Sequence, residues 1–429
     1  MFQDFLSELQ IDNSANISSK YEEITASLNK KFRSSDSKIA NRLQVGSYGR
    51  HTGIKGISDL DMLYIMPANK WDDYKDNKQS QLLTDTKDAI KSRYPNTEVK
   101  VDRLVVQVLF TNFQVEVQPV FEQDDESFKY PDTYDGGSWK ETKPRAEIAA
   151  MKEFVDQKNS NLRKLCKMTR SWKNKHGVAM GGLLIDTLAY NFLKSTDDYD
   201  DKSYSNYDGL SRDFFKYLSD EDDKDYYLAL GSRQQVKVRS KFQNKAKKAY
   251  ELCLKAIESG DSGPAHTKWK KVYGKPFPAK PTEASEATSS SRSAVTWVNT
   301  EQFIEDQYPI DIRYRLDIDC KVSQDGFRDN FLRTMLKVGM LLQAKKKLLF
   351  TINNISAPEP YFIEWKVLNR GDEARRRNNI RGQIFADDGH HQQKESTMFH
   401  GKHIVECYVI KNGVVVARDR IDVPITGET

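Results

Sequence analysis

The chain has 429 residues, with 67 lysines and arginines, 62 aspartates and glutamates, and a formal net charge of +5. At roughly 150 residues per domain, this length predicts two or three domains. Hydrophobic residues make up 38% and aromatic residues 11% of the chain, which suffices for packed cores and excludes a chain that is disordered throughout. The mild positive charge permits an anionic ligand but does not require one.

Two further features bear on where the protein works. No stretch approaches the roughly 18 consecutive apolar residues of a membrane-spanning helix, and the opening segment MFQDFLSELQ lacks the basic and apolar regions of a secretory signal. The four cysteines are far apart and form no CxxC pair, which fits a reducing compartment and no zinc knuckle. We therefore expect a soluble, cytoplasmic protein without membrane attachment.

The first elements are two helices and a strand. Apolar residues at spacings of three and four predict a helix over residues 19–32, and after Ser35 a second short helix is predicted to run towards Asn41. The period then changes. A short apolar run over residues 60–66, stopped by Pro67, predicts a buried strand.

The next elements are a hairpin and a helical region. Residues 101–110 and 113–121 are predicted to be strands joined by a turn at residues 111–112. Three segments beyond them show helical apolar spacing. They are residues 145–175, interrupted at 159–161, residues 181–193 and residues 237–257.

A change in composition then separates two regions. Residues 280–293, KPTEASEATSSSRS, have no apolar period and predict a linker. The predicted parts are a helix-rich domain over residues 1–279, a linker over 280–296 and a β-rich domain over 297–429.

The last part is dominated by strand patterns. Strands are predicted over residues 310–322, 361–368, 403–410 and 414–423, with a hairpin turn at residues 411–413. Residues 327–342 fit a helix or a broken strand, and the pattern does not decide between them. A small β-rich sandwich is the predicted architecture.

The densest chemical signal is a pair of carboxylates. Asp59 and Asp61 stand one residue apart at the start of a strand, so both lie on one face, where they repel each other unless a cation lies between them. Such oxygen ligands suit Mg²⁺, which binds carboxylates together with substrate phosphates. Upstream, Gly46 and Ser47 offer amides and a hydroxyl for phosphate oxygens. A DxD alone is common by chance, and the combination with the Gly-Ser pair carries the prediction.

A third carboxylate completes the set. Glu116 stands in an apolar strand between Val115 and Val117, where a charge is costly unless it is paired or binds a metal. The alternative is an edge strand with Glu116 facing water. Together with Asp59 and Asp61, Glu116 predicts a two-metal site for phosphoryl transfer, in which one ion activates a hydroxyl and the other stabilises the leaving pyrophosphate.

Several segments of the sequence together resemble a known family. The pattern G-S-x-x-R-x-T-x-I, then S-D-L-D, then V-E-V-Q-P, resembles the cGAS/DncV-like nucleotidyltransferases (CD-NTases, SMODS type) of the polymerase-β superfamily. LRKLCKMTRSWKNKHG and GGLLIDTLAYNF resemble the family's helical half, and YFIEWKVLNRGDEARRRNNIRG with GKHIVECYVIKNGVVVARDRIDV resembles the adenylyl/guanylyl and SMODS C-terminal sensor (AGS-C) domain. The resemblance implies an α+β fold, with a polymerase-β-like nucleotidyltransferase core and a helical half, followed by a small β-rich, sandwich-like domain.

The resemblance also implies an activity. Such an enzyme joins nucleoside triphosphates, without a template, into a cyclic or short linear oligonucleotide and releases pyrophosphate. In bacteria such products are second messengers of anti-phage defence, which a separate effector reads. Carried over to this chain, the resemblance assigns Gly46 and Ser47 to the triphosphate, and Asp59, Asp61 and Glu116 to two Mg²⁺ ions, or to Mn²⁺.

Three assignments have competing interpretations. Glu116 falls where the family most often has Asp, so its role as third ligand depends on the longer side chain. Lys167 and Lys173, six residues apart on one predicted helix, are candidates for triphosphate contact or plain surface lysines. Tyr134 is a candidate for stacking on a base, or an aromatic residue that anchors its loop.

Two clusters of basic residues near the carboxyl end have a surface loop as their default interpretation. Five arginines could bind an anion such as a nucleotide or nucleic acid, although a solvated loop is the default interpretation; they are Arg370, Arg375, Arg376, Arg377 and Arg381. Four histidines lie in a polar segment without carboxylate or cysteine at ligand spacing and predict a surface loop, not a metal site. They are His390, His391, His400 and His403.

The catalytic residues alone leave two other functions open. One is a nucleotidyltransferase that modifies a macromolecule, such as a tRNA end or a protein. The other is a degenerate transferase that only senses a nucleotide, which the intact Asp59, Asp61 and Glu116 disfavour. The length of the helical half and the appended C-terminal domain favour synthesis of an oligonucleotide.

Overall fold

The computed structural model describes residues 1–158, 160–260, 263–279, 300–324, 328–340 and 342–426. The chain divides into two compact units, Met1–Pro281 and Thr282–Thr429, and the predicted linker lies outside the described residues. None of the helices within these ranges is long and apolar enough to cross a bilayer.

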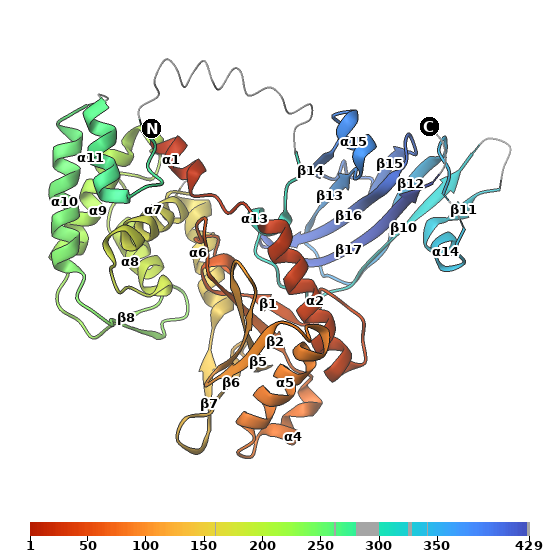
Figure 1. Cartoon of the computed structure of the whole chain (residues 1–429), viewed down its shortest axis with the longest axis horizontal. Coiled ribbons are helices and arrows are strands. Elements are labelled where there is room, and N and C mark those ends of the chain that lie inside the picture. Colours follow the sequence, from red (N-terminus) through yellow and green to blue (C-terminus); the bar gives the residue numbers. More distant parts are fainter. Residues whose placement is uncertain (159, 261–262, 280–299, 325–327, 341, 427–429) are drawn as a thin grey trace. The chain divides into compact units, whose positions relative to one another are not determined.

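The first unit is built on a mixed sheet of strand order β1-β2-β5-β4-β3, which β6 and β7 extend from β5 (Figure 1). The strands are β1 Arg42–Gln44, β2 Asp59–Ile65, β3 Glu98–Asp102, β4 Val105–Leu109, β5 Gln114–Glu122, β6 Phe128–Asp132 and β7 Ser138–Thr142. Strands β2 and β5 run parallel, and the other neighbouring pairs are antiparallel. The predicted hairpin between β4 and β5 is confirmed.

The two faces of this sheet have different surroundings, because side chains alternate along a strand. Leu60, Met62 and Val115 are fully buried in one core with helices α2 Ser14–Arg33 and α5 Gln79–Arg93. The opposite face of the same strands carries the carboxylates at one end. Farther along that face, Leu63 of β2 and Val120 of β5 are buried in a smaller core with Phe128 of β6, so the face is accessible at its carboxylate end.

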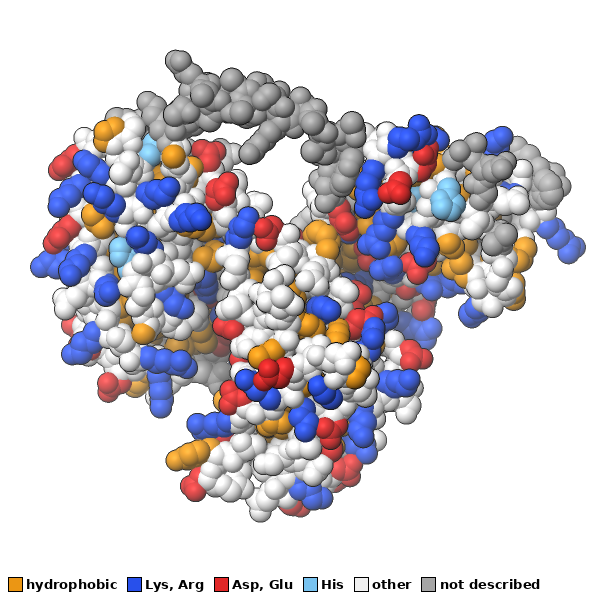
Figure 2. Space-filling view, viewed as in Figure 1, with side chains coloured by type: hydrophobic (Ala, Val, Ile, Leu, Met, Phe, Trp, Pro, Cys, Tyr) orange, Lys and Arg blue, Asp and Glu red, His pale blue; other side chains and the backbone are white. Residues whose placement is uncertain are grey.

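The remaining helices of this unit form a second core around Trp172 and Trp269, both fully buried. They are α1 Phe2–Glu8, α6 Pro144–Gln157, α7 Asn161–His176, α8 Gly182–Lys194, α9 Tyr207–Asp220, α10 Gln243–Ile257 and α11 Gly263–Tyr273. The predicted break between α6 and α7 is confirmed, and Ser160 adopts a left-handed φ of 55° there. Figure 2 shows lysines and arginines spread over the face of α10 and α11, interspersed with acids, so this face is a solvated one.

The first unit also contains several short elements. They are α3 Gly46–Gly49, η1 Ala68–Lys70, α4 Trp71–Tyr74, η2 Tyr134–Gly136, η3 Tyr204–Asn206, β8 Tyr226–Leu228 and β9 Gln235–Lys237.

The second unit is a β-sandwich, as predicted. Its two antiparallel sheets have the orders β11-β10-β12-β15 and β14-β13-β16-β17, and Phe350, Trp365 and Cys407 are fully buried in its core. Its elements are α13 Ile304–Gln307, β10 Leu316–Ser323, β11 Asn330–Phe331, α14 Leu332–Lys337, β12 Lys347–Ile355, β13 Phe362–Leu368, α15 Asp372–Arg376, β14 Arg381–Ala386, β15 Gln392–Ser396, β16 Gly401–Lys411 and β17 Val414–Ile425. The predicted turn between β16 and β17 is confirmed, with Asn412 and Gly413 at φ 51° and 68°.

The helix predicted after Ser35 is wrong. Helix α2 ends at a left-handed Ser34 with φ 49°, and the following segment has no helical hydrogen bonds. Instead, the buried Asn29 amide donates to the carbonyls of Ser37 and Ala40 at 2.8 and 3.0 Å. A side chain from the preceding helix therefore satisfies the carbonyls that a new helix would have used.

Other boundaries differ as well. The strand predicted over residues 101–110 is two strands, because Arg103, at φ 27°, turns the chain so that Asp102 pairs with Val105. The helix predicted from residue 237 begins only at Gln243. The strand predicted from residue 310 begins at Leu316, and residues 327–342 contain both a short strand and a short helix.

Candidate active site

The three predicted carboxylates lie on one face of two adjacent parallel strands. In the register of β2 and β5, Asp59 pairs with Gln114 and Asp61 pairs with Glu116. Residues in register share a face, so the carboxylates of Asp59, Asp61 and Glu116 point to the same side, and all three line one open cavity of about 620 Å³. The alternation of β2 and the parallel pairing of β5 together assemble the acidic set.

Gly46 and Ser47 line the same cavity, in the turn that follows β1. Gly46 has a φ of 64°, and a Cβ built on it would lie 1.8 Å from Asp61 Oδ2. The backbone therefore approaches the carboxylate more closely than any side chain would allow. The Ser47 carbonyl accepts hydrogen bonds from the amides of Thr52 and Gly53 at 2.9 and 3.0 Å, which closes the loop.

Burial and electrostatic repulsion between carboxylates raise the pKa values of Asp61 and Glu116. Burial, together with the charges of Glu116 and Asp59, raises the pKa of Asp61 to about 6, although Arg50 opposes the shift. Burial also raises the pKa of Glu116, with smaller contributions from Asp59 and Asp102. A cation placed between these groups would remove the repulsion, so the electrostatics favour a bound positive charge.

The donor set fits a hard divalent cation, since it offers carboxylate oxygens beside a phosphate-sized cavity. As the side chains stand, no group of three or more His, Cys, Asp or Glu in the described ranges is close enough to hold a metal ion. Asp59 and Glu116 accept hydrogen bonds from a side-chain amide. The Gln114 Nε2 donates to Asp59 Oδ1 at 2.9 Å and to Glu116 Oε1 at 3.2 Å.

Basic side chains line the same cavity. They include Arg170 and Lys173 of α7, and Arg239 beyond β9. Burial and the neighbouring charge of Arg170 lower the pKa of Lys173. The cavity thus brings carboxylates and basic groups together, as a bound triphosphate with its metal ions would require.

Two of the predicted binding residues lie elsewhere. Lys167 is on α7 but is not among the described residues that line the cavity. Tyr134 is 68% exposed in η2, where the Arg103 guanidinium lies 4.8 Å from its ring centroid. Of the two lysines and the tyrosine, the fold brings only Lys173 to the carboxylates.

A buried ion network beneath the cavity was missed by the sequence analysis. Asp186 of α8, fully buried, accepts from Arg50 Nε at 2.9 Å, Arg170 Nη1 at 2.6 Å and Thr52 Oγ1 at 3.1 Å. Arg50 also pairs with Glu147 of α6 at 3.3 Å. The signal was present in the sequence, since Asp186 is a lone acid in the apolar segment GGLLIDTLAYNF.

Two family models match parts of this chain. A family model described as the Second Messenger Oligonucleotide or Dinucleotide Synthetase (SMODS) domain matches residues 1–154, and one described as the Adenylyl/Guanylyl and SMODS C-terminal sensor domain matches residues 298–426. No curated protein matches the chain in sequence.

Solved structures of similar fold include a chain of the E. coli MS115-1 CdnC:HORMA-deltaN complex, with 14% identity and a TM-score of 0.51, covering 65% of this chain and 96% of that chain. The Vibrio cholerae DncV cyclic AMP-GMP synthase is 14% identical, with a TM-score of 0.45 over 55% of this chain and 69% of that chain. Rhodothermus marinus CdnE c-UMP-AMP synthase is 13% identical, with a TM-score of 0.44 over 61% of this chain and 96% of that chain. At 14% identity, the CdnC match shows a shared fold.

Asp186→Asn should destabilise the first unit by about 3–5 kcal/mol, because the buried Arg170 loses its carboxylate partner and the buried Arg50 keeps only Glu147. Burial alone would raise the pKa of Asp186, but Arg170 and Arg50 lower it to about 2. Its contribution is therefore complete above its ordinary pKa of 3.8 and is lost as the pH falls towards 2. Denaturant unfolding across this range measures both effects.

Asp197→Asn is the matched control, because that side chain is 94% exposed and surface pairs contribute about 0–1 kcal/mol. Equal stability of the two variants at neutral pH would contradict the role assigned to the network.

Gly46→Ala should lower turnover by about 100-fold, because the new methyl group and the Asp61 carboxylate cannot keep their positions. Gly177→Ala carries similar backbone strain at φ 58° but meets nothing within 4 Å, and should leave turnover nearly unchanged. Rates of nucleotide incorporation, compared with thermal unfolding of both variants, separate the clash from the strain. Similar rates for the two variants would show that the close approach is not required.

Proposed function

We propose that the chain joins nucleoside triphosphates into a cyclic oligonucleotide second messenger with release of pyrophosphate, because residues 1–154 match the SMODS domain and residues 298–426 match the C-terminal sensor domain. The observation that carries the proposal is the register of β2 and β5, which gathers Asp59, Asp61 and Glu116 beside Gly46 in one cavity. Bacterial anti-phage signalling through a separate effector, in the cytoplasm, is the proposed setting.

The reaction forms one bond and breaks one. A ribose hydroxyl oxygen of the acceptor attacks the α-phosphorus of the donor triphosphate, and the bond between the α-phosphorus and the bridging oxygen to the β-phosphorus breaks. Bound Mg²⁺ or Mn²⁺ supplies activation of the hydroxyl and charge neutralisation of the pyrophosphate. Asp59, Asp61 and Glu116 would hold these ions, and Glu116 is the proposed acceptor of the proton that the attacking hydroxyl loses.

The rest of the cavity binds the substrates. Gly46 and Ser47 bring their amides and hydroxyl to the donor phosphates. Lys173 and Arg239, which line the same cavity, balance the triphosphate charge. The cavity volume of about 620 Å³ falls in the range of small-molecule sites, which is about 300–1,000 Å³. This size favours nucleotides over a macromolecular acceptor buried in the site.

Purified protein incubated with labelled nucleoside triphosphates and Mg²⁺ or Mn²⁺ should give a product that resists phosphatase, since a cyclic product has no terminal phosphate. Asp59→Ala combined with Asp61→Ala should remain folded and give none. Glu116→Gln should keep donor binding while turnover falls by about 100-fold or more. Label transferred only to an added tRNA or protein would contradict the proposal and favour the macromolecule-modifying function.

The C-terminal unit is proposed to bind an anionic ligand and to regulate synthesis. Most arginines of the predicted cluster already have acidic partners on the short helix α15. Arg375 pairs with Asp372 at 3.0 Å, and Arg376 and Arg377 both pair with Glu373. These side chains are exposed, so a ligand would gain little by displacing such local pairs.

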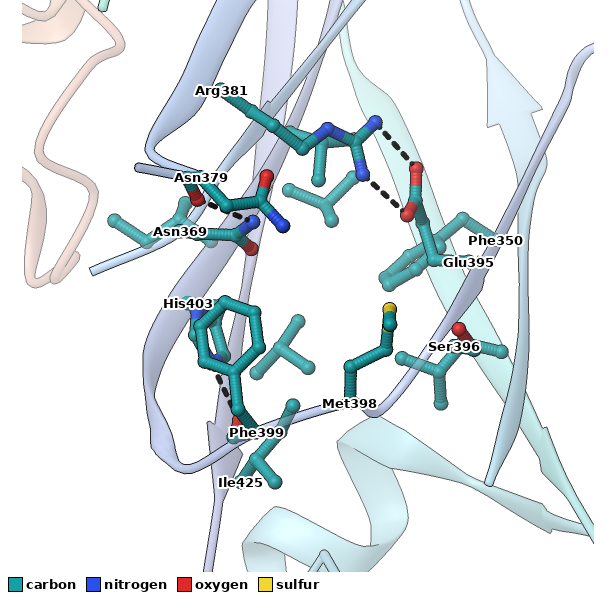
Figure 3. Close-up of a pocket in the computed structure, with 15 residues that line it drawn as sticks. Phe350, Asn369, Asn379, Arg381, Glu395, Ser396, Met398, Phe399, His403 and Ile425 are labelled. Carbon is teal, nitrogen blue, oxygen red and sulfur yellow. Dashed lines mark hydrogen bonds and ion pairs between the residues drawn. The ribbon is translucent and has the colours of Figure 1, made fainter. Parts of the chain in front are cut away.

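Arg381 is placed differently, as Figure 3 shows. Its guanidinium makes two hydrogen bonds to Glu395 at 2.6 and 2.9 Å, at the edge of a cavity of about 70 Å³ between the two sheets. Phe350, Phe399 and His403 also line this cavity. A volume of 70 Å³ holds only about two waters, which is too small for a nucleotide, so the proposed contact is at the Arg381–Glu395 pair on its edge. A phosphate can replace Glu395 because both present two oxygens to a guanidinium.

Glu395→Gln should tighten binding of a single-stranded oligonucleotide to the full chain by about tenfold, because Arg381 then loses its charged competitor. Arg381→Gln should abolish that binding. Fluorescence anisotropy measures affinity, and the rate of product formation with and without the oligonucleotide measures regulation. A regulator must bind the active and inactive states unequally, so an unchanged rate at saturation would remove the regulatory role.

A further inference from the structure

Gln114 connects two of the proposed metal ligands. It is the first residue of β5 and lies in register with Asp59 of β2. One nitrogen, Nε2, donates to Asp59 Oδ1 at 2.9 Å and to Glu116 Oε1 at 3.2 Å. A primary amide carries two hydrogens, so both bonds form at once. The side chain spans the gap between the strands.

A second amide supports the same oxygen of Glu116. Gln107 of β4 lies in register with Glu116 and donates through Nε2 to Oε1 at 3.1 Å. In the described hydrogen bonds, Oε1 therefore receives both glutamine donors, while Oε2 receives neither. Two donors on one oxygen fix the plane of the carboxylate and leave the other oxygen for a ligand.

Asp59 is fixed in a similar way. Its Oδ1 accepts from Gln114, and its Oδ2 accepts from the Ser58 hydroxyl at 3.1 Å. Asp59 is exposed, whereas Asp61 and Glu116 are half-buried, so Asp59 has the most freedom to turn away. Like-charge repulsion would drive that movement, and the Gln114 amide is the contact that opposes it across the two strands.

We propose that Gln114 is a positioning residue, which bridges Asp59 and Glu116 across the two strands and keeps these two proposed metal ligands from moving apart. The inference rests on the proposed function of these carboxylates as metal ligands. Groups that hydrogen-bond to ligating side chains pre-orient them, and their removal commonly weakens metal affinity by about 10–100-fold. Gln114 is expected to act in this way, without touching the nucleotide.

The test is Mn²⁺ binding to the full chain, measured by electron paramagnetic resonance without nucleotide. Gln114→Leu should weaken Mn²⁺ affinity by about 10–100-fold. Gln107→Leu should have a smaller effect, since Glu116 is the one of the three proposed ligands that loses a donor, the other bond of Gln107 being to Asp102. Gln123→Leu is the matched control, because Gln123 bonds only the Phe121 carbonyl among its described side-chain contacts. Thermal unfolding checks that each variant is folded.

A second readout separates positioning from catalysis. High Mg²⁺ or Mn²⁺ should restore turnover of Gln114→Leu, since binding is the defect, but should not restore Glu116→Gln. If Gln114→Leu does not fold, Gln114→Asn carries the test. Its shorter side chain reaches only one carboxylate, so its affinity should also be weaker than that of the wild type.

The outcomes distinguish the two proposals. Wild-type Mn²⁺ affinity in a folded Gln114 variant would overturn the positioning role and leave the proposed function standing. Weakened Mn²⁺ binding in that variant, with no nucleotide product from the wild type, would support positioning and contradict the proposed function. A wild-type chain that binds no Mn²⁺ would overturn both.

Discussion

The buried ion network around Asp186 is the constraint on which the active-site geometry depends. Arg50 belongs to the turn that carries Gly46, whereas Asp186 and Arg170 belong to α8 and α7. Charges buried in this way are tolerated only when each has its partners, so the turn and the helices must meet in one arrangement. Because Gly46 is four residues from Arg50, that arrangement also sets where the loop meets Asp61. The carboxylates of β2 and β5 and the basic side chains of α7 are thereby held around one cavity.

The shared face of Asp59 and Asp61 was predictable from the sequence, because strand alternation is a local rule. Glu116 was a candidate because an acid in an apolar strand is costly, but its place beside Asp61 depends on the pairing of β2 with β5. Helix geometry limits which basic side chains reach the cavity. At 3.6 residues per turn, positions six apart on a helix differ by roughly 120° in direction. Lys167 and Lys173 therefore cannot face the same ligand, and the structure brings only Lys173 to the cavity.

Several failures share a physical cause, which is a polar contact between one element and another segment of the chain. Asn29 suppresses the helix predicted after Ser35 by bonding its carbonyls from another element. Arg50 and Asp186 are 136 positions apart, and the pairing of Asp59 with Gln114 arises only once β2 and β5 align. Apolar periodicity records which face of an element is buried. It does not record which polar side chain of another element meets it.

The C-terminal unit satisfies its charges locally, and this changes what its arginines can do. Arg376 and Arg377 share the one carboxylate of Glu373 within four residues, so local pairing offsets part of their charge. The pair between Arg381 and Glu395 instead joins β14 to β15, strands of different sheets. A two-point contact is replaced only by a ligand that offers two oxygens in the same plane, which a carboxylate or phosphate can do and a single hydroxyl cannot. The position of this pair, rather than the number of arginines, is what would make the domain selective.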